Sequence, residues 1–240
     1  MGRLKPISVT WYGHSAFLLR DSAGFSVLVD PWLTNPKSPL APREVTPPDL
    51  ILITHGHGDH IGDTIEIARA TGAPVVAIHE VSLWLTARGV SNVTGMNKGG
   101  TLGIGNAAVT MTHAVHSSDI DVGGADAVKP GGAPAGFVID FPGHPKVYHA
   151  GDTDVFGDMR IIRDLHRPDI AILPIGGLYT MGPREAALAV EFLGPRHVIG
   201  MHYGTFPSLR GTPRELSAHL PDALKGIVVE LAPGAPKTFE

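Results

Sequence analysis

The chain has 240 residues, of which 43% are hydrophobic and 18% charged, the composition of a folded globular protein. Its net charge of −4, without a run of Lys or Arg, argues against a broad nucleic-acid or anionic-membrane surface and favours a small-molecule substrate. Because the chain has no cysteine, disulfides and thiol nucleophiles are excluded, and a metal would need His and carboxylate ligands.

Short apolar runs bounded by Gly, Pro or Asp predict about eleven strands. In chain order these are Ile7–Trp11, Ala16–Leu19, Phe25–Val29, Leu50–Ile53, Val75–Ile78, Ala108–Thr112, Gly136–Phe141, Lys146–Tyr148, Ile170–Leu173, His197–Gly200 and Ile227–Leu231. The helical pattern covers Asp63–Thr71, Val81–Arg88, Val155–Leu165 and Pro183–Leu193, and another helix starts at the capping box Thr212–Glu215.

The order of these elements predicts the architecture. A strand meander and a strand–helix alternation are followed by a second strand group and a second alternation, with no linker. We therefore expect one α/β domain over residues 1–240, built as a four-layer αββα sandwich from two similar halves, roughly 1–118 and 119–240. The Gly-rich segment Asp119–Ala135 is typical of a loop that covers a site.

The apolar runs of the sequence also bear on where in the cell the protein is located. The N-terminal stretch MGRLKPISVTWYGHSAFLL has no signal-peptide core, and no apolar run reaches membrane-spanning length. These features favour the cytoplasm and no membrane partner. They leave the oligomeric state open, and a homo-oligomer is compatible with them.

The densest chemical signal is THGHGDH, directly after the apolar run Leu50–Ile53. A strand end followed by a Gly-rich turn can bring several ligands together. His55 and His57 can point toward one metal, while Asp59 and His60, turning into a helix, can face a second. A solvent-exposed histidine cluster is the alternative, which this strand–turn–helix context disfavours.

This motif resembles the H-x-H-x-D-H signature of the metallo-β-lactamase-fold hydrolases. The later metal positions of that family are matched by His116 in THAVHSSD, Asp152 in YHAGDTD and His202 in IGMHYGTF. The resemblance implies two divalent metal ions. It assigns His55, His57 and His116 to the first ion, Asp59, His60 and His202 to the second, and Asp152 to a bridge between them.

Further motifs extend the resemblance. The segments WYGHSAFLL, DPWL, THGHGDHIGD, YHAGDTDVF and LPIGGLYTMGP are similar to an uncharacterised metal-dependent hydrolase branch related to bacterial ascorbate-6-phosphate lactonases. It implies that Asp30 supports the metal loop without binding metal and that His14 lines the pocket. His149 either orients a ligand through a hydrogen bond or is structural.

Several other histidines, a tyrosine and a threonine lie near these motifs or elsewhere in the chain. His113 is expected on the opposite face from His116. Tyr179 and Thr180 either line the pocket or form a packing turn. The remaining histidines are expected to be structural or exposed, namely His79, His144, His166, His197 and His219.

The implied chemistry is hydrolysis of a small ester-type substrate, a phosphodiester or a lactone, by a metal-bridging hydroxide. Asp59 would orient the water or transfer a proton, and His14 would bind the leaving group or the oxyanion. Zinc is the first expectation for the metal, while His and Asp ligands also accept manganese, iron or nickel. The alternative function is a non-catalytic metal-binding or structural protein of the same fold.

The candidate ligands of this chain match the ligand sets of branches with other chemistry less well. The flavodiiron branch has Glu where this chain has His57, and the commonest β-lactamases use a Cys ligand and lack the bridging Asp. Hydrolysis of a small ester-type bond is therefore the favoured activity.

Overall fold

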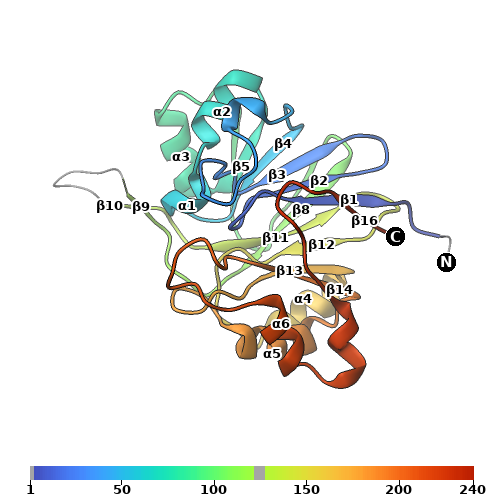
Figure 1. Ribbon diagram of the computed structural model, residues 1–240. Helices are drawn as coiled ribbons and strands as arrows, with labels where there is room; N and C mark the ends of the chain where they lie inside the picture. The colour runs from blue at the N-terminus through green and yellow to red at the C-terminus, as the bar shows by residue number, and fades with distance from the viewer. Residues whose placement is uncertain (1–2, 122–127) are drawn as a thin grey trace.

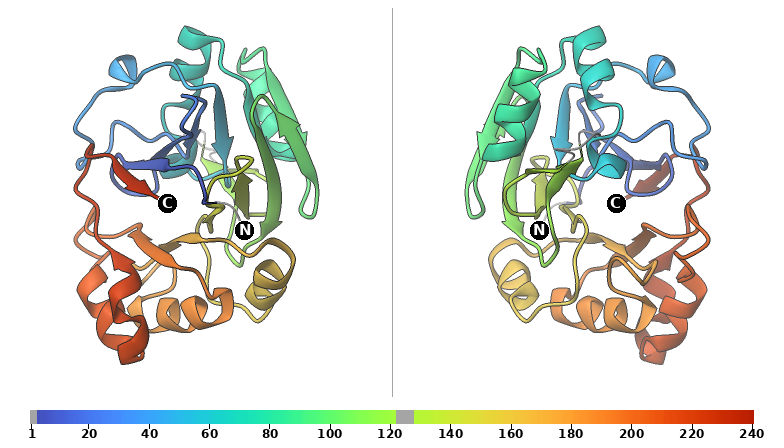
Figure 2. Two further views of the ribbon diagram at one scale, coloured as in Figure 1. Left: turned by 90° about the vertical axis from the view of Figure 1, so that its right-hand side faces the viewer. Right: turned by 90° about the vertical axis from the view of Figure 1, so that its left-hand side faces the viewer.

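The computed structural model describes residues 3–121 and 128–240. Within them, two seven-stranded sheets pack face to face, with one group of helices outside each sheet (Figures 1 and 2). Helices α1–α3 cover the first sheet and α4–α6 the second. The predicted α/β class and four-layer αββα sandwich are thus confirmed.

The first sheet has the strand order β16-β1-β2-β3-β4-β5-β6. Its strands are β1 (Ile7–Trp11), β2 (Phe17–Arg20), β3 (Ser26–Val29), β4 (Leu50–Ile53), β5 (Val75–Ile78), β6 (Val93–Met96) and β16 (Lys237–Phe239). Outside it lie α1 (Gly58–Ile61), α2 (Thr64–Thr71), α3 (His79–Ala87) and the 3-10 helix η1 (Pro42–Glu44).

The second sheet has the order β15-β14-β13-β12-β11-β8-β7. Its strands are β7 (Thr101–Ile104), β8 (Ala107–His113), β11 (Ala135–Asp140), β12 (Val147–His149), β13 (Ile170–Pro174), β14 (His197–Met201) and β15 (Val228–Val229). It is covered by α4 (Met159–His166), α5 (Pro183–Leu193) and α6 (Pro213–His219), which the 3-10 helix η2 (Asp222–Ile227) follows. A separate pair is formed by β9 (Asp119–Asp121) and β10 (Val128–Pro130).

The central strands are buried on both faces. All four residues of β4 and of β5 are buried, and so are all five of β13. A strand covered by helices on one side and by the other sheet on its second side has to be apolar throughout. This is why these strands read as unbroken apolar runs in the sequence.

Strand direction brings the candidate ligands to one edge. β3 and β4 are parallel, and so are β12, β13 and β14. β8 and β12 are each antiparallel to β11, so β8 also runs in the direction of β12. The segments that follow β8, β12 and β14 therefore leave the second sheet at the same edge, where they meet those that follow β3 and β4.

Several predicted boundaries were wrong for identifiable reasons. β6, β7 and β16 were missed because each is short and at least half exposed, and glycine interrupts two of them. α4 begins at Met159 instead of Val155, and only Val228–Val229 of the last predicted strand is extended.

The segment predicted as a loop over residues 119–135 contains β9 and β10, whose pairing supplies backbone hydrogen bonds that a loop would lack. Residues 122–127 of that segment lie outside the described residues. In the part of the chain that is described, no helix combines the length and the apolar character needed to cross a membrane.

Candidate metal centre

The loop after β4 carries the first candidate ligands and is anchored by Asp30. Thr54 donates its N–H to Asp30 Oδ1 over 2.8 Å and its hydroxyl to Asp30 Oδ2 over 2.7 Å. A Cβ at Gly56 would come within 2.8 Å of the Ser118 carbonyl oxygen, whereas one at Gly58 would meet no described atom within 4 Å. Close approach to the segment after β8 therefore explains the glycine at position 56.

A first group consists of His55, His57 and His116. One ring nitrogen from each lies within 4.8 Å of the other two. His55 Nε2 and His57 Nδ1 are 3.0 Å apart, and His57 Nε2 also lies 3.2 Å from the Ser117 hydroxyl. His55 and His57 follow β4 and His116 follows β8, so this group joins the two sheets.

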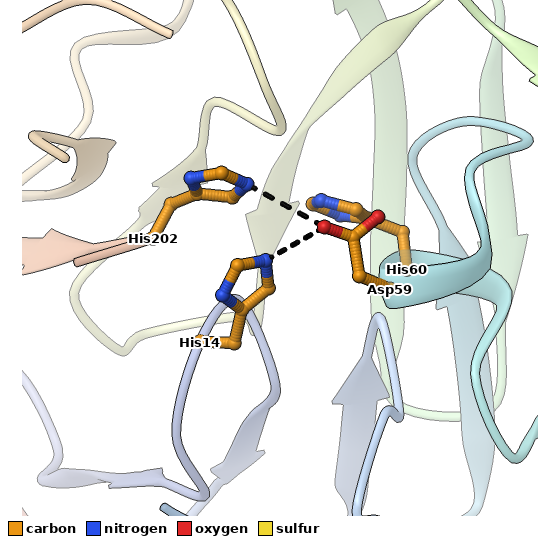
Figure 3. A group of neighbouring side chains, drawn as sticks. All are labelled: His14, Asp59, His60 and His202. Carbon is orange, nitrogen blue, oxygen red and sulfur yellow. Dashed lines mark hydrogen bonds and ion pairs between the residues drawn. The ribbon is translucent and has the colours of Figure 1, made fainter. Parts of the chain in front are cut away.

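A second group consists of His14, Asp59, His60 and His202, whose ligand atoms also lie within 4.8 Å of one another. Figure 3 shows the Asp59 carboxylate pointing toward the rings of His14 and His202. Asp59 Oδ2 is 3.0 Å from His14 Nε2 and 3.7 Å from His202 Nε2. The other ring nitrogen of His14, Nδ1, lies 2.9 Å from the Thr205 hydroxyl.

Asp152 lies between the two groups. Its Oδ2 is 3.0 Å from His202 Nε2, 3.3 Å from His60 Nε2 and 3.7 Å from His116 Nε2. The side chain is buried, and the segment after β12 carries it to the edge where the other strands end. A single carboxylate oxygen is thus within reach of both groups.

Two histidines of the second group have strained backbones. His14 and His202 have φ angles of 50° and 55°, in the left-handed region that non-glycine residues seldom adopt. The His202 N–H donates to the His14 carbonyl over 3.0 Å, and the Trp11 indole donates to the same oxygen over 2.9 Å. Such strain persists where the surrounding structure holds it, often at functional sites.

Burial sets the charge of several rings. It lowers the pKa of His55 well below the usual value, and it lowers the pKa of His14 to about 4 although Asp59 acts in the opposite direction. Both imidazoles are therefore neutral near pH 7, which is the form that binds metal.

Asp152 reverses this effect at two other rings. Burial disfavours the charged forms of His60 and His202, but Asp152, together with Asp30 at His60 and with Asp59 at His202, outweighs it and raises both pKa values, that of His202 to about 9. Both imidazoles are therefore protonated near neutral pH in the absence of metal. A metal ion would have to displace one proton from each ring.

Asp30 orients one histidine of each group. Its Oδ2 accepts a hydrogen bond from His60 Nδ1 over 2.8 Å, which leaves His60 Nε2 facing Asp152. The Thr54 hydroxyl donates to the same Oδ2. Its oxygen lies 3.0 Å from His55 Nδ1 and can accept a hydrogen bond from the Nδ1–H. Asp30 itself is fully buried and belongs to neither group, and its supporting role stays a prediction.

Among the described residues, His149 makes no hydrogen bond to a candidate ligand side chain. Its Nε2 lies 3.2 Å from the Ser15 carbonyl, and its Nδ1 accepts the Gly151 N–H over 3.3 Å. The ring is fully buried and acts on the backbone of the turn before Asp152, because β12 directs it into the core.

The donor atoms fit divalent metal ions. Asp152 Oδ1 is buried without a hydrogen-bond partner among the described residues, and His60 Nε2 has only its 3.3 Å approach to Asp152 Oδ2. Buried polar atoms are ordinarily paired, so the orphaned carboxylate oxygen points to a missing partner. Imidazole nitrogens with carboxylate oxygens are the ligands that zinc and similar ions take.

The structure brings six of the seven sequence-predicted ligands into these groups and places the seventh, Asp152, between them, and His14 joins the second group. Tyr179 lines the cavity above them, but Thr180 is not among the lining residues. Sequence reasoning missed Thr205 and Phe206, although the GTF that follows His202 was a signal, since residues directly after a ligand share its loop. His113 is exposed and contacts Lys98, away from His116, as expected.

Known proteins are similar to this chain over most of its length. A family model described as a beta-lactamase superfamily domain matches residues 26–203. A "UPF0173 metal-dependent hydrolase" of Methanosarcina mazei is 48% identical over 229 residues, which cover 95% of this chain and 96% of that protein. Another from Koribacter versatilis is 50% identical over 214 residues, covering 89% and 91% of the two chains.

Solved structures agree with these sequence relatives. The structure of a novel metallo hydrolase from the archaeon Ignicoccus hospitalis matches with a TM-score of 0.87 and 39% identity, covering 98% of this chain and 99% of that one. A metal-dependent hydrolase from Parabacteroides distasonis matches with a TM-score of 0.72 and 26% identity, covering 95% and 94%.

Proposed function

The chain belongs to the beta-lactamase superfamily and is a metal-dependent hydrolase like its UPF0173 relatives, and we propose that it holds two divalent metal ions and cleaves a small ester-type substrate. Zinc is the first candidate for both ions. The substrate would be a phosphodiester or a lactone, the two classes that the sequence favours. The relation to ascorbate-6-phosphate lactonases stays a prediction.

The position of Asp152 carries the binuclear part of this proposal. Its Oδ2 lies within 3.7 Å of ring nitrogens from both groups, so one carboxylate can serve two ions. His55, His57 and His116 would hold the first ion, and Asp59, His60 and His202 the second. When bound, two such ions acidify a water molecule and polarise the oxygen of the bond to be cleaved.

Asp59 is the residue best placed to handle a proton. Burial disfavours its charged form, but hydrogen bonds from His14 and His202 outweigh burial and hold its pKa below the ordinary value. An ionised carboxylate at the cavity floor can orient a water molecule by accepting a hydrogen bond from it. His14 fixes this carboxylate through Nε2 and is itself held at Nδ1 by Thr205.

The organisation of the chain belongs to the same proposal. We propose that residues 1–240 are one domain, because the candidate centre takes residues from both 1–118 and 119–240. Neither half has the complete ligand set.

The test is metal removal followed by reloading. Protein stripped with a chelator is reloaded with zinc, manganese, nickel or iron, and its metal content is determined by elemental analysis. We expect about two ions per chain and hydrolysis that depends on them. A protein that binds no metal under any condition would refute the binuclear site, and a loaded protein without any ester-type activity would support the structural alternative.

A further inference from the structure

The candidate metal centre opens into a cavity of about 310 Å³. Since one molecule of liquid water occupies about 30 Å³, the cavity has room for a small organic molecule of about ten water volumes. Candidate metal ligands, including Asp59, Asp152 and His202, form its floor. Its wall is made by Ser117, Tyr179 and Phe206, which no metal-binding role explains.

The wall is aromatic and exposed. The Tyr179 and Phe206 side chains are 59% and 39% exposed. Trp32 stacks against Phe206 with ring centroids 5.8 Å apart, and His14 meets both rings edge-on. Large apolar side chains held at the mouth of a cavity mark a surface that binds a ligand.

A strained turn positions Tyr179 in this wall. Gly177 and Leu178 have φ angles of 75° and 53°, and the Tyr179 N–H donates to the Gly177 carbonyl over 2.7 Å. A leucine in the left-handed region is strained. Leu178 is also 72% exposed, so burial of its side chain does not repay this strain. The turn instead keeps Tyr179 beside the cavity.

Apart from the candidate metal-binding imidazoles, the described lining of the cavity offers no cationic side chain to an anionic substrate. Its lining residues among those described include carboxylates and imidazoles but neither Lys nor Arg. Residues 122–127, which the structure does not describe, contain neither residue type in the sequence. Beyond the proposed metal ions and the imidazoles that would hold them, the described lining supplies no positive charge, whereas sites that recognise phosphate groups ordinarily add Arg or Lys to the oxygens.

Resting on the hydrolase function above, we propose that the substrate is an uncharged carboxylic ester or lactone whose alkyl or aryl group packs against Tyr179 and Phe206. Phosphate esters are then poor substrates. In the reaction, the oxygen of water bonds to the carbonyl carbon and the ester C–O bond breaks. One proton of that water goes to the leaving alkoxide, and the new carboxylic acid releases the other to solvent.

The test compares three compounds on the metal-loaded protein: γ-decanolactone, its unsubstituted parent γ-butyrolactone, and bis(p-nitrophenyl) phosphate. We expect the highest kcat/KM for the alkyl lactone. Substituting Phe206→Ala and Tyr179→Ala together should lower that value about tenfold, as the loss of a hydrophobic contact does, and change the value for γ-butyrolactone less than about twofold. The control is Leu165→Ala, which alters a still more exposed apolar residue on α4.

Binding provides a second readout that does not need turnover. The lactam analogue 5-hexyl-2-pyrrolidinone should bind the intact protein in calorimetry and lose about tenfold in affinity in the double variant. Faster hydrolysis of the phosphodiester than of the alkyl lactone, or equal losses on both lactones, would overturn the proposed substrate class and leave the hydrolase function standing. Failure to hydrolyse any of the three would overturn both.

Discussion

Replacing Asp30 by Asn should disable the metal centre without removing any metal ligand. The change is nearly isosteric at a fully buried position. An amide oxygen can still accept the Thr54 N–H, and the Thr54 hydroxyl can turn to accept from the new amide. The Nδ1–H of His60, 2.8 Å from Asp30 Oδ2, would however face an N–H₂ group, so two donors would oppose each other.

His60 can relieve that opposition by changing tautomer. With the proton on Nε2, its Nδ1 accepts from the amide, and its Nε2–H points at Asp152 Oδ2, 3.3 Å away. The nitrogen needed for the metal is then blocked. If the ring does not switch, a buried donor stays unpaired at a cost of about 1–3 kcal/mol. Either way, we expect affinity at the second site to fall by about 10–100-fold or more.

Calorimetric titration of metal-free Asp30→Asn with zinc, together with elemental analysis, measures this loss. Nitrogen-15 NMR of the histidines reads the tautomer directly. Asp63→Asn is the matched control, because Asp63 also accepts backbone N–H bonds, from Leu33 and Thr34, but contacts no imidazole. If Asp30→Asn bound two ions with wild-type affinity, the orienting role of Asp30 would be refuted.

The other predictions concern the ligands themselves. The purified protein should contain about two divalent ions per chain by elemental analysis, and one ion in every preparation would contradict the shared role of Asp152. Asp152→Ala should reduce turnover more than His149→Ala, since the first change disturbs both groups and the second only a backbone turn; equal losses in steady-state assays would refute the bridge. In metal-free protein, the pKa of His202, raised to about 9, adds stability that is complete below pH 6.5 and disappears as pH rises through 9. Denaturant titrations from pH 6 to 10 should show this decline, while zinc affinity rises over the same range; a pH-independent zinc affinity would contradict it.

The sequence located the candidate ligands because each of them lies shortly after a strand whose end it could place. β4, β13 and β14 are apolar and bounded by turn residues, so their ends could be located to within a residue or two. The carboxyl ends of parallel strands share an edge, and residues just beyond them meet. The order of the strands and helices was therefore enough to predict that His55 and His202 lie close together.

What the sequence could not predict depends on side-chain direction. His149 was placed beside Asp152 by spacing alone, but β12 turns it into the core toward the Ser15 carbonyl. Phe206 gave no periodic signal, because it lies in an irregular loop after β14. The edge strands β6 and β7 were missed because their half-exposed residues lack the apolar pattern of the centre.

The candidate ligands come from both halves of the chain, so they leave the ribosome at different times. A ribosome adds about 5–20 residues per second, so His55, His57 and His60 emerge on the order of ten seconds before His202. A metal ion captured early would find an incomplete site, and only the arrival of Asp152 beside His60 and His202 completes it. If the centre binds metal as proposed, the ion also favours the late docking of the second sheet onto the first, and metal supply affects the yield of folded protein as well as its activity.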